Sequence, residues 1–150
     1  MFTQENVSYQ IVEIIPLILR FLHTEMRASA GGMGPSHFQL LGMLARQPCN
    51  LSEIAERQSV TAATISNSVN ILVERGWIQR IPVSHDRRMV RVDLTPAGKE
   101  VLLKSHQGLE KRVNQRVSEL PAEDLDKLMV GLQILRRVLD TSSVGERNCE

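Results

Sequence analysis

The chain has 150 residues, a length that favours one domain, and 42% of them are hydrophobic, which excludes a disordered chain. The formal net charge of +1 excludes a polycation, and the apolar run 11–22 is broken by Glu13, Pro16 and Arg20 and is too short to span a bilayer. Nothing resembles a secretion signal, so we expect a cytoplasmic protein with reduced thiols and a single domain over residues 1–150. Aromatic residues make up only 3%, so the core should be aliphatic, which suits helix packing.

The first fifty residues follow a helical pattern. Apolar residues recur at helical spacing over about 7–27, although Pro16 should kink or split this helix. The glycines of 31–34 form a break, and Pro35 then opens a second helix that should end near Pro48.

A helix-turn-helix pattern comes next. Asn50, with a carboxylate at Glu53, predicts a capped short third helix, and residues 59–60 form the turn after it. Thr61 is the expected N-cap of a fourth helix, for which Gly76 is the C-terminal stop.

The segment after this helix has the pattern of a β-hairpin. Residues 77–81 predict a short strand, 82–88 a polar loop, and 89–94 a strand that alternates apolar and charged side chains. Two strands joined by a basic loop form a wing beside the helix-turn-helix.

Two helices complete the chain. Thr95 and Pro96 are a cap followed by proline at the first helical position, and they start a helix to about Ser118. A sixth helix begins at Pro121, and the tail after Asp140 is polar. The fold class is therefore mainly α with a small β-hairpin wing: a winged helix-turn-helix with further helices at both ends.

The fourth helix is the expected reading element. Its inward face is apolar, and its opposite face is small or amide-bearing and carries no charge, so it can approach base edges closely. Asparagine can bond adenine, alanine and threonine methyls can touch the thymine methyl, and threonines at the helix start can bond phosphate. The alternative is an ordinary solvated helix face. The candidate DNA-binding residues on this helix are Thr61, Ala62, Ala63, Thr64, Ser66, Asn67 and Asn70.

The wing loop supplies the second set of candidates. Arg87 and Arg88 can enter a minor groove or bind phosphate, and Ser84 and His85 would lie near the backbone. Asp86 is expected to pair with an arginine and brace the wing. The alternative is a solvated charged turn. The charge balance supports a wing loop that contacts DNA, because residues 57–99 hold seven basic and three acidic side chains.

These residues resemble the multiple antibiotic resistance regulator (MarR) family. The Asp-x-Arg wing followed by Leu-Thr-x-x-Gly is the specific part, because helix-turn-helix strings are common to many regulators. The resemblance covers nearly the whole chain and rests on residues 51–55, 60–66, 73–80, 86–88 and 92–98.

The resemblance implies an obligate, roughly triangular homodimer. The winged helix would occupy about 36–98, and helices at about 7–27 and 96–140 would interlock between the two chains. These helices carry more apolar surface than one small monomer could bury, notably at Ile14, Ile18, Leu125, Leu128, Leu132 and Leu135. Two wings about a two-fold axis imply double-stranded DNA with a pseudo-palindromic operator, whose half-sites are about 10–10.5 bp apart. In the family pattern Arg88 enters the minor groove, Asp86 braces it, and Arg87 lies near phosphate.

The resemblance also implies a repressor that releases DNA when a small phenolic or anionic ligand binds. His37 is the best candidate ligand residue, because it follows Gly34-Pro35-Ser36, where related regulators line a pocket; Met33 could line it and Arg27 could attract a carboxylate. The alternative is that His37 merely lies near a helix start.

Other functions are weaker interpretations of this sequence. Oxidant sensing would need a reactive cysteine in the first helix, whereas Cys49 lies in a loop and Cys149 in the tail. Metal sensing would need a ligand cluster, and the histidines have no tight spacing. No cofactor and no enzymatic activity are expected, because the chain has no nucleophile–base pair and no phosphate-cradling glycine loop. A metal-responsive regulator and a winged-helix protein-interaction module remain the alternatives.

Overall fold

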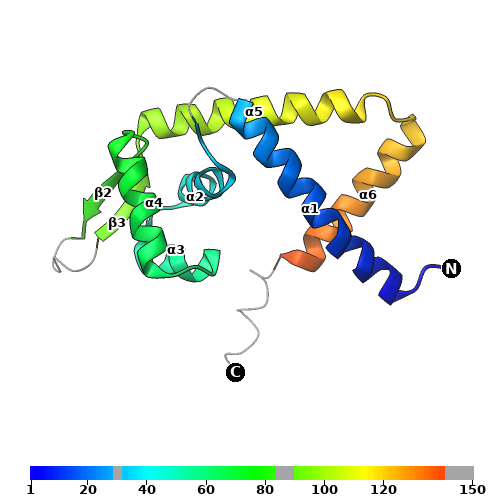
Figure 1. Cartoon of the computed structure of the whole chain (residues 1–150), viewed down its shortest axis with the longest axis horizontal. Coiled ribbons are helices and arrows are strands. Elements are labelled where there is room, and N and C mark those ends of the chain that lie inside the picture. Colours follow the sequence, from blue (N-terminus) through cyan, green and yellow to red (C-terminus); the bar gives the residue numbers. More distant parts are fainter. Residues whose placement is uncertain (29–31, 84–89, 141–150) are drawn as a thin grey trace. The chain divides into compact units, whose positions relative to one another are not determined.

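The computed structural model describes residues 1–28, 32–83 and 90–140. The chain divides into two compact units, Met1–Lys111 and Arg112–Glu150, with the boundary inside one helix. Among the described residues there are six helices and three strands, and Figure 1 labels all of them except β1. In chain order they are α1 Gln4–Ala28, α2 Pro35–Arg46, β1 Cys49–Asn50, α3 Leu51–Gln58, α4 Ala62–Glu74, β2 Ile78–Pro82, β3 Val90–Leu94, α5 Pro96–Val117 and α6 Ala122–Leu139. The mainly helical architecture with a β wing is confirmed.

The first helix is longer than predicted and is not split. Pro16 lies inside α1, which runs without interruption from Gln4 to Ala28. Proline removes one backbone donor and crowds the preceding turn, but a helix of 25 residues tolerates that local loss. Pro16 was expected to kink or split this helix, and of these two outcomes the split does not occur.

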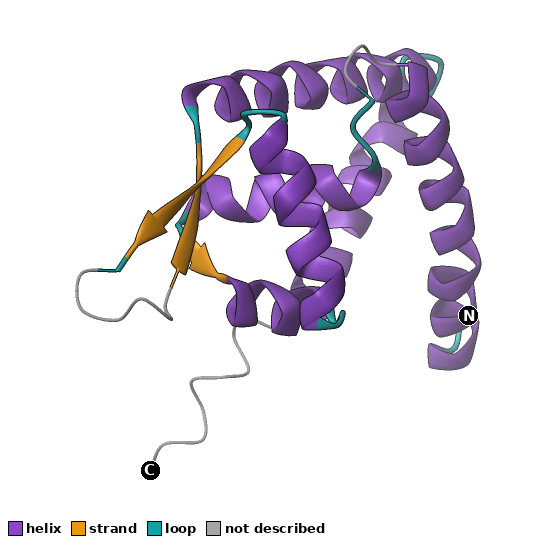
Figure 2. Cartoon of the chain, turned by 60° about the vertical axis from the view of Figure 1, so that its left-hand side comes forward, coloured by secondary structure: helices purple, strands orange, loops and turns teal. Residues whose placement is uncertain are grey.

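The sheet has three strands, not the two predicted. β2 and β3 form the expected antiparallel hairpin, in which Ile78 pairs with Leu94 and Pro82 with Val90. The additional strand is β1, where Cys49 pairs with Val92, so the order is β1-β3-β2 (Figure 2). A two-residue strand is too short to carry an alternating pattern, so the sequence offered no signal for it.

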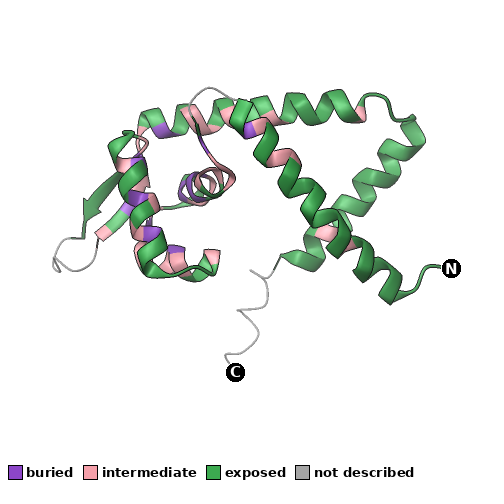
Figure 3. Ribbon diagram, viewed as in Figure 1, coloured by how far each residue is buried: buried purple, intermediate pink, exposed green. Residues whose placement is uncertain are grey.

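The core of the first unit is aliphatic and lies among α2, α3, α4 and the sheet (Figure 3). Leu41, Ile54, Val69 and Leu72 have no exposed surface. Val92 and Leu94 come from alternate positions of β3, as predicted for its inward face. This packing holds α4 against α3 and the sheet and leaves the other face of α4 exposed.

Both predicted ends of the helix-turn-helix are confirmed by their hydrogen bonds. Asn50 Oδ1 accepts a bond from the Glu53 amide at 2.8 Å, and Glu53 Oε2 accepts one from the Asn50 amide at 3.0 Å, which completes a capping box. Gly76 has φ +73°, its amide bonds the Val73 carbonyl, and the Trp77 amide bonds the Leu72 carbonyl. These two bonds form a Schellman motif that ends α4.

The Leu-Thr-x-x-Gly sequence also has a structural explanation. Thr95 Oγ1 accepts a bond from the Gly98 amide at 3.0 Å and donates one to the Gly76 carbonyl at 2.5 Å. A Cβ on Gly98 would lie 1.9 Å from the Trp77 carbonyl oxygen. The motif therefore joins the start of α5 to the end of α4 by a close backbone contact that only glycine permits.

Helices α1 and α6 leave apolar faces uncovered within the chain. Ile14 and Ile18 of α1 are nearly half exposed, and α6 buries none of its residues. On α6, Leu125, Leu128 and Leu132 are exposed and Leu135 is half-buried. Over the described residues, no helix combines the length and apolar character needed to cross a bilayer.

Candidate DNA-binding surface

The outward face of α4 carries the predicted reading residues. Ile65, Val69 and Leu72 point into the core, with at most 1% exposure. The opposite face carries no charged side chain, and its residues are exposed except Ser66, which is half-buried. The exposed members of the predicted set are Thr61, Ala62, Ala63, Thr64, Asn67 and Asn70.

The start of α4 is fixed by two threonines. Thr61 is the N-cap, and its Oγ1 accepts a bond from the Thr64 amide at 3.2 Å. The two hydroxyl oxygens also lie 2.9 Å apart, within hydrogen-bond distance. Because both side chains are exposed at the positive end of a helix, they lie where an anion is favoured.

The structure adds one residue that the sequence analysis did not single out. Arg80 Nη2 on β2 donates a hydrogen bond to Asn70 Oδ1 on α4. Both side chains belong to exposed residues, so the pair forms a continuous polar surface from the helix to the wing strands. The basic composition of 57–99 and the resemblance over 73–80 both included Arg80, but neither pointed to its partner, which lies ten positions away on another element.

The predicted wing contacts, Ser84, His85, Asp86, Arg87 and Arg88, lie outside the described residues. The strands on either side of them are described, and Pro82 pairs with Val90 across the hairpin.

A second arginine near the end of α4 has a structural environment. Arg75 lies over the Trp77 ring, 5.0 Å from its centroid, and its Nη1 donates to the Gly32 carbonyl at 3.3 Å. Arg75 thus ties the segment before α2 to the end of α4, a contact that helps to orient the helix.

The three predicted ligand residues occupy different environments. Met33 is 3% exposed and belongs to the hydrophobic core, whereas Arg27 is exposed in the last turn of α1. His37 is half-buried in the first turn of α2, and its Nδ1 is buried without a hydrogen-bond partner. Burial, and then the nearby positive charge of Arg75, lower the pKa of His37 below its ordinary value, so the neutral imidazole is favoured.

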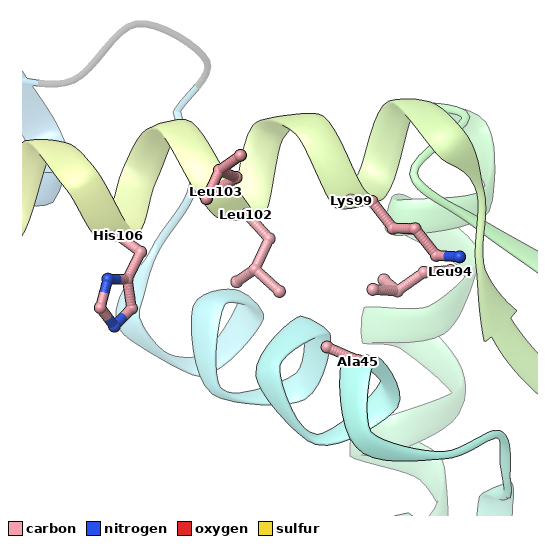
Figure 4. A pocket seen from close by; sticks show the side chains of 6 residues that line it. All are labelled: Ala45, Leu94, Lys99, Leu102, Leu103 and His106. Atoms are coloured by element: carbon pink, nitrogen blue, oxygen red, sulfur yellow. The ribbon is translucent and has the colours of Figure 1, made fainter.

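A cavity of about 350 Å³ lies between α2, the end of β3 and α5 (Figure 4). Lys99 and His106 lie at its two ends along α5, and Leu102 points from α5 toward α2. His106 also stacks on Phe38 of α2, with ring centroids 6.3 Å apart. The lining residues are Ala45, Leu94, Lys99, Leu102, Leu103 and His106. No pattern in the sequence marks this cavity, because its walls come from three separate segments.

The two cysteines and the possible metal ligands were the remaining candidates for a sensing site. Cys49 has no exposed surface, its Sγ lies 3.4 Å from the Gln47 carbonyl oxygen, and burial raises the pKa of its thiol, which disfavours the reactive thiolate. Cys149 lies outside the described residues. Across residues 1–28, 32–83 and 90–140, no three His, Cys, Asp or Glu side chains are grouped to hold a metal ion.

Comparison with known proteins identifies the family. Residues 31–89 match the MarR family. The chain is 38% identical over 68 residues to the uncharacterized HTH-type transcriptional regulator YpoP of Bacillus subtilis, a match that covers 45% of this chain and 48% of YpoP. The chain thus spans about half the length of that relative.

Two solved structures resemble the chain over most of its length. The MarR family transcriptional regulator Sco3205 of Streptomyces coelicolor, crystallised with DNA, is 27% identical with a TM-score of 0.67, and the match covers 95% of this chain and 92% of Sco3205. Wild-type MarR of E. coli, in its apo form, has a TM-score of 0.74 at 21% identity, and the match covers 93% of this chain and 98% of that chain. At this level of identity the match shows the fold alone. With the capped recognition helix, the hairpin wing and the Thr95–Gly98 junction, these matches lead to one conclusion: residues 31–89 belong to the MarR family of winged helix-turn-helix transcriptional regulators, and the chain is similar to structures of that family over most of its length.

Proposed function

We propose that this protein binds a pseudo-palindromic operator as a homodimer, represses transcription, and releases DNA when a small organic anion binds. The observation that carries the DNA-binding part is the exposed, uncharged face of α4, whose small side chains allow the helix backbone to approach base edges. The similar Sco3205 was crystallised with DNA, which supports the same partner for this chain.

The homodimer is supported by the apolar faces of α1 and α6. An isolated chain leaves Ile14, Ile18 and Leu132 about half exposed, and a second copy is the partner that the family resemblance implies for them. A two-fold dimer carries two α4 helices and two wings, which matches a palindromic site whose half-sites are one helical turn apart.

The wing residues complete the proposed DNA contacts. Arg88 is assigned to the minor groove, Arg87, Ser84 and His85 to the neighbourhood of the backbone, and Asp86 to bracing the loop. These assignments follow from the family resemblance and from the antiparallel strands that lead into the loop.

The first experiment is a fluorescence anisotropy titration of the purified protein against DNA from upstream of its own gene, with random duplex as competitor. Binding that survives excess competitor supports a specific regulator. Binding no tighter than that of random DNA, over scanned upstream fragments, would contradict it and would favour a winged-helix module that binds a protein.

The ligand response is assigned to the cavity between α2 and α5. Its walls are mainly leucine and alanine, and Lys99 supplies one positive charge, so it suits an amphipathic carboxylate or phenolate. The sequence prediction instead placed the ligand at His37, Arg27 and Met33, of which Met33 has almost no free surface.

Two charge-removing variants decide between these positions. Benzoate is titrated into the protein–DNA complex of the wild type, Lys99→Gln and Arg27→Gln. We expect benzoate to release DNA from the wild type and Arg27→Gln, and to require a higher concentration for Lys99→Gln. Loss of the response only in Arg27→Gln would place the ligand near His37 instead.

A further inference from the structure

The hydrogen bond between Asn70 and Arg80 defines which atoms of this pair remain available. A guanidinium has only donors, so the atom of Asn70 that it bonds must be the carbonyl oxygen. The amide nitrogen of Asn70 and the remaining N–H groups of Arg80 are then left to meet a ligand. Such a surface, rich in N–H donors and positively charged, favours an anionic acceptor.

This arrangement is unfavourable for direct base reading by Asn70. Bidentate recognition of adenine needs the asparagine carbonyl oxygen as acceptor and its amide nitrogen as donor. Arg80 already engages that oxygen. Asn67, one turn earlier on the same exposed face, has both groups available for that contact in the geometry of α4.

The position of Asn70 and Arg80 also argues against base reading by this pair. Recognition helices contact bases chiefly through their N-terminal residues. Asn70 lies in the C-terminal half of α4, which runs from Ala62 to Glu74, and Arg80 lies beside it on β2. If the N-terminal half of α4 enters the major groove, this end of the helix and the adjacent strand would face the phosphates that border the groove.

We propose that Arg80 contacts an operator phosphate and that Asn70 is its positioning residue rather than a reader of bases. This inference rests on the proposed function and changes the role expected for Asn70. The bond to Asn70 holds the long arginine side chain in one place before DNA binds, which lowers the ordering cost of the contact. The pair thus sets the register of the helix on the duplex without carrying sequence information.

The test is a salt titration of DNA affinity for the wild type, Arg80→Gln, Asn70→Ala and the double variant, on operator and random duplex. Lys104→Gln on α5 removes another exposed positive charge, one that pairs with Glu100, and serves as the control. Arg80→Gln should lower the slope of log affinity against log salt by about 0.9 per phosphate contact, hence about 1.8 for a dimer. Arg80→Gln should lower the affinity for the operator and for random DNA by the same factor.

Asn70→Ala should lower the affinity for DNA by a smaller factor than Arg80→Gln does, and this factor should be the same for operator and random duplex. In the double variant, Asn70→Ala should lower the affinity no further than Arg80→Gln alone. If Asn70 reads a base, its loss would appear on the operator alone and would persist in the Arg80→Gln background, which overturns the inference. An unchanged salt slope in Arg80→Gln also overturns it. In both cases the wild type still binds its operator, whereas a wild type that binds no DNA specifically overturns the proposed function itself. Thermal unfolding of each variant verifies that all are folded.

Discussion

Gly98 has room for a hydrogen atom but not for a methyl group, because its ideal Cβ position lies 1.9 Å from the Trp77 carbonyl oxygen. Gly98→Ala should therefore push α5 away from the end of α4 and lower the free energy of unfolding by about 1–3 kcal/mol or more. Urea denaturation measures this change.

Gly108→Ala in the same helix is the matched control. Its added Cβ meets nothing within 4 Å. Alanine favours the helix over glycine by about 0.8–1 kcal/mol, so this variant should be more stable than the wild type. Equal free energies of unfolding for Gly98→Ala and Gly108→Ala would contradict the close contact at Gly98.

Asn67 is the proposed base reader of α4. Asn67→Ala should weaken operator binding by about 1–3 kcal/mol per bidentate contact and leave binding to random DNA nearly unchanged. Anisotropy titrations on the two duplexes measure the difference, with Gln107→Ala on α5 as a control. Similar losses on both duplexes would make Asn67 a backbone contact instead.

His37 gives the stability of the protein a pH dependence. Its pKa is lowered in the folded chain, by burial first and then by Arg75, so protonation favours the unfolded chain. The contribution of His37 to the free energy of unfolding is complete above the ordinary histidine pKa of about 6.5. It is lost as the pH falls through the lower pKa that His37 has in the folded chain.

Thermal unfolding between about pH 7 and pH 5 tests this, because it spans the ordinary histidine pKa. The melting temperature of the wild type should fall more steeply on acidification than that of His37→Gln, and His23→Gln, which removes an exposed imidazole of α1, should follow the wild type. Parallel curves for wild type and His37→Gln would refute the assignment.

At the scale of the element, the capping box determines where α3 begins. Asn50→Ala removes the acceptor for the Glu53 amide and should cost about 1 kcal/mol of stability. Asn50→Asp retains the acceptor and should remain within a few tenths of a kcal/mol of the wild type. Thermal unfolding compares the wild type with the two variants. If Asn50→Ala had the melting temperature of the wild type, packing alone would hold this helix end.

Predicted helix limits agree with the structure where a capping residue marks them. Asn50, Thr61, Gly76 and Thr95 each form the bonds expected of them, because caps act over three or four neighbouring residues. Strand β1 was missed because its two residues become a strand only by pairing with β3, some forty positions away.

At the scale of the whole molecule, the proposed dimer can be tested on α6. Leu132 is 51% exposed in the single chain, so Leu132→Asp should hardly affect an isolated protomer. In a homodimer the same change buries a charge, so the variant should be monomeric by light scattering and should lose operator binding.

Gln133→Asp is the control, because it adds the same charge to the neighbouring polar position of α6. It should remain dimeric. If the Leu132→Asp protein remained dimeric, the face of α6 that carries Leu132 would not be part of the dimer interface.

The sequence by itself determined the order of the six helices and the two hairpin strands, the inward faces of α4 and β3, and the exposed small-residue face of α4. These features depend on local periodicity and capping, which neighbouring residues control. Tertiary structure alone decided that Arg80 engages Asn70, that Met33 is part of the core, and that α2, β3 and α5 line a common pocket. Each of these depends on side chains from separate segments meeting in space, and no pattern along the chain encodes which segments will meet.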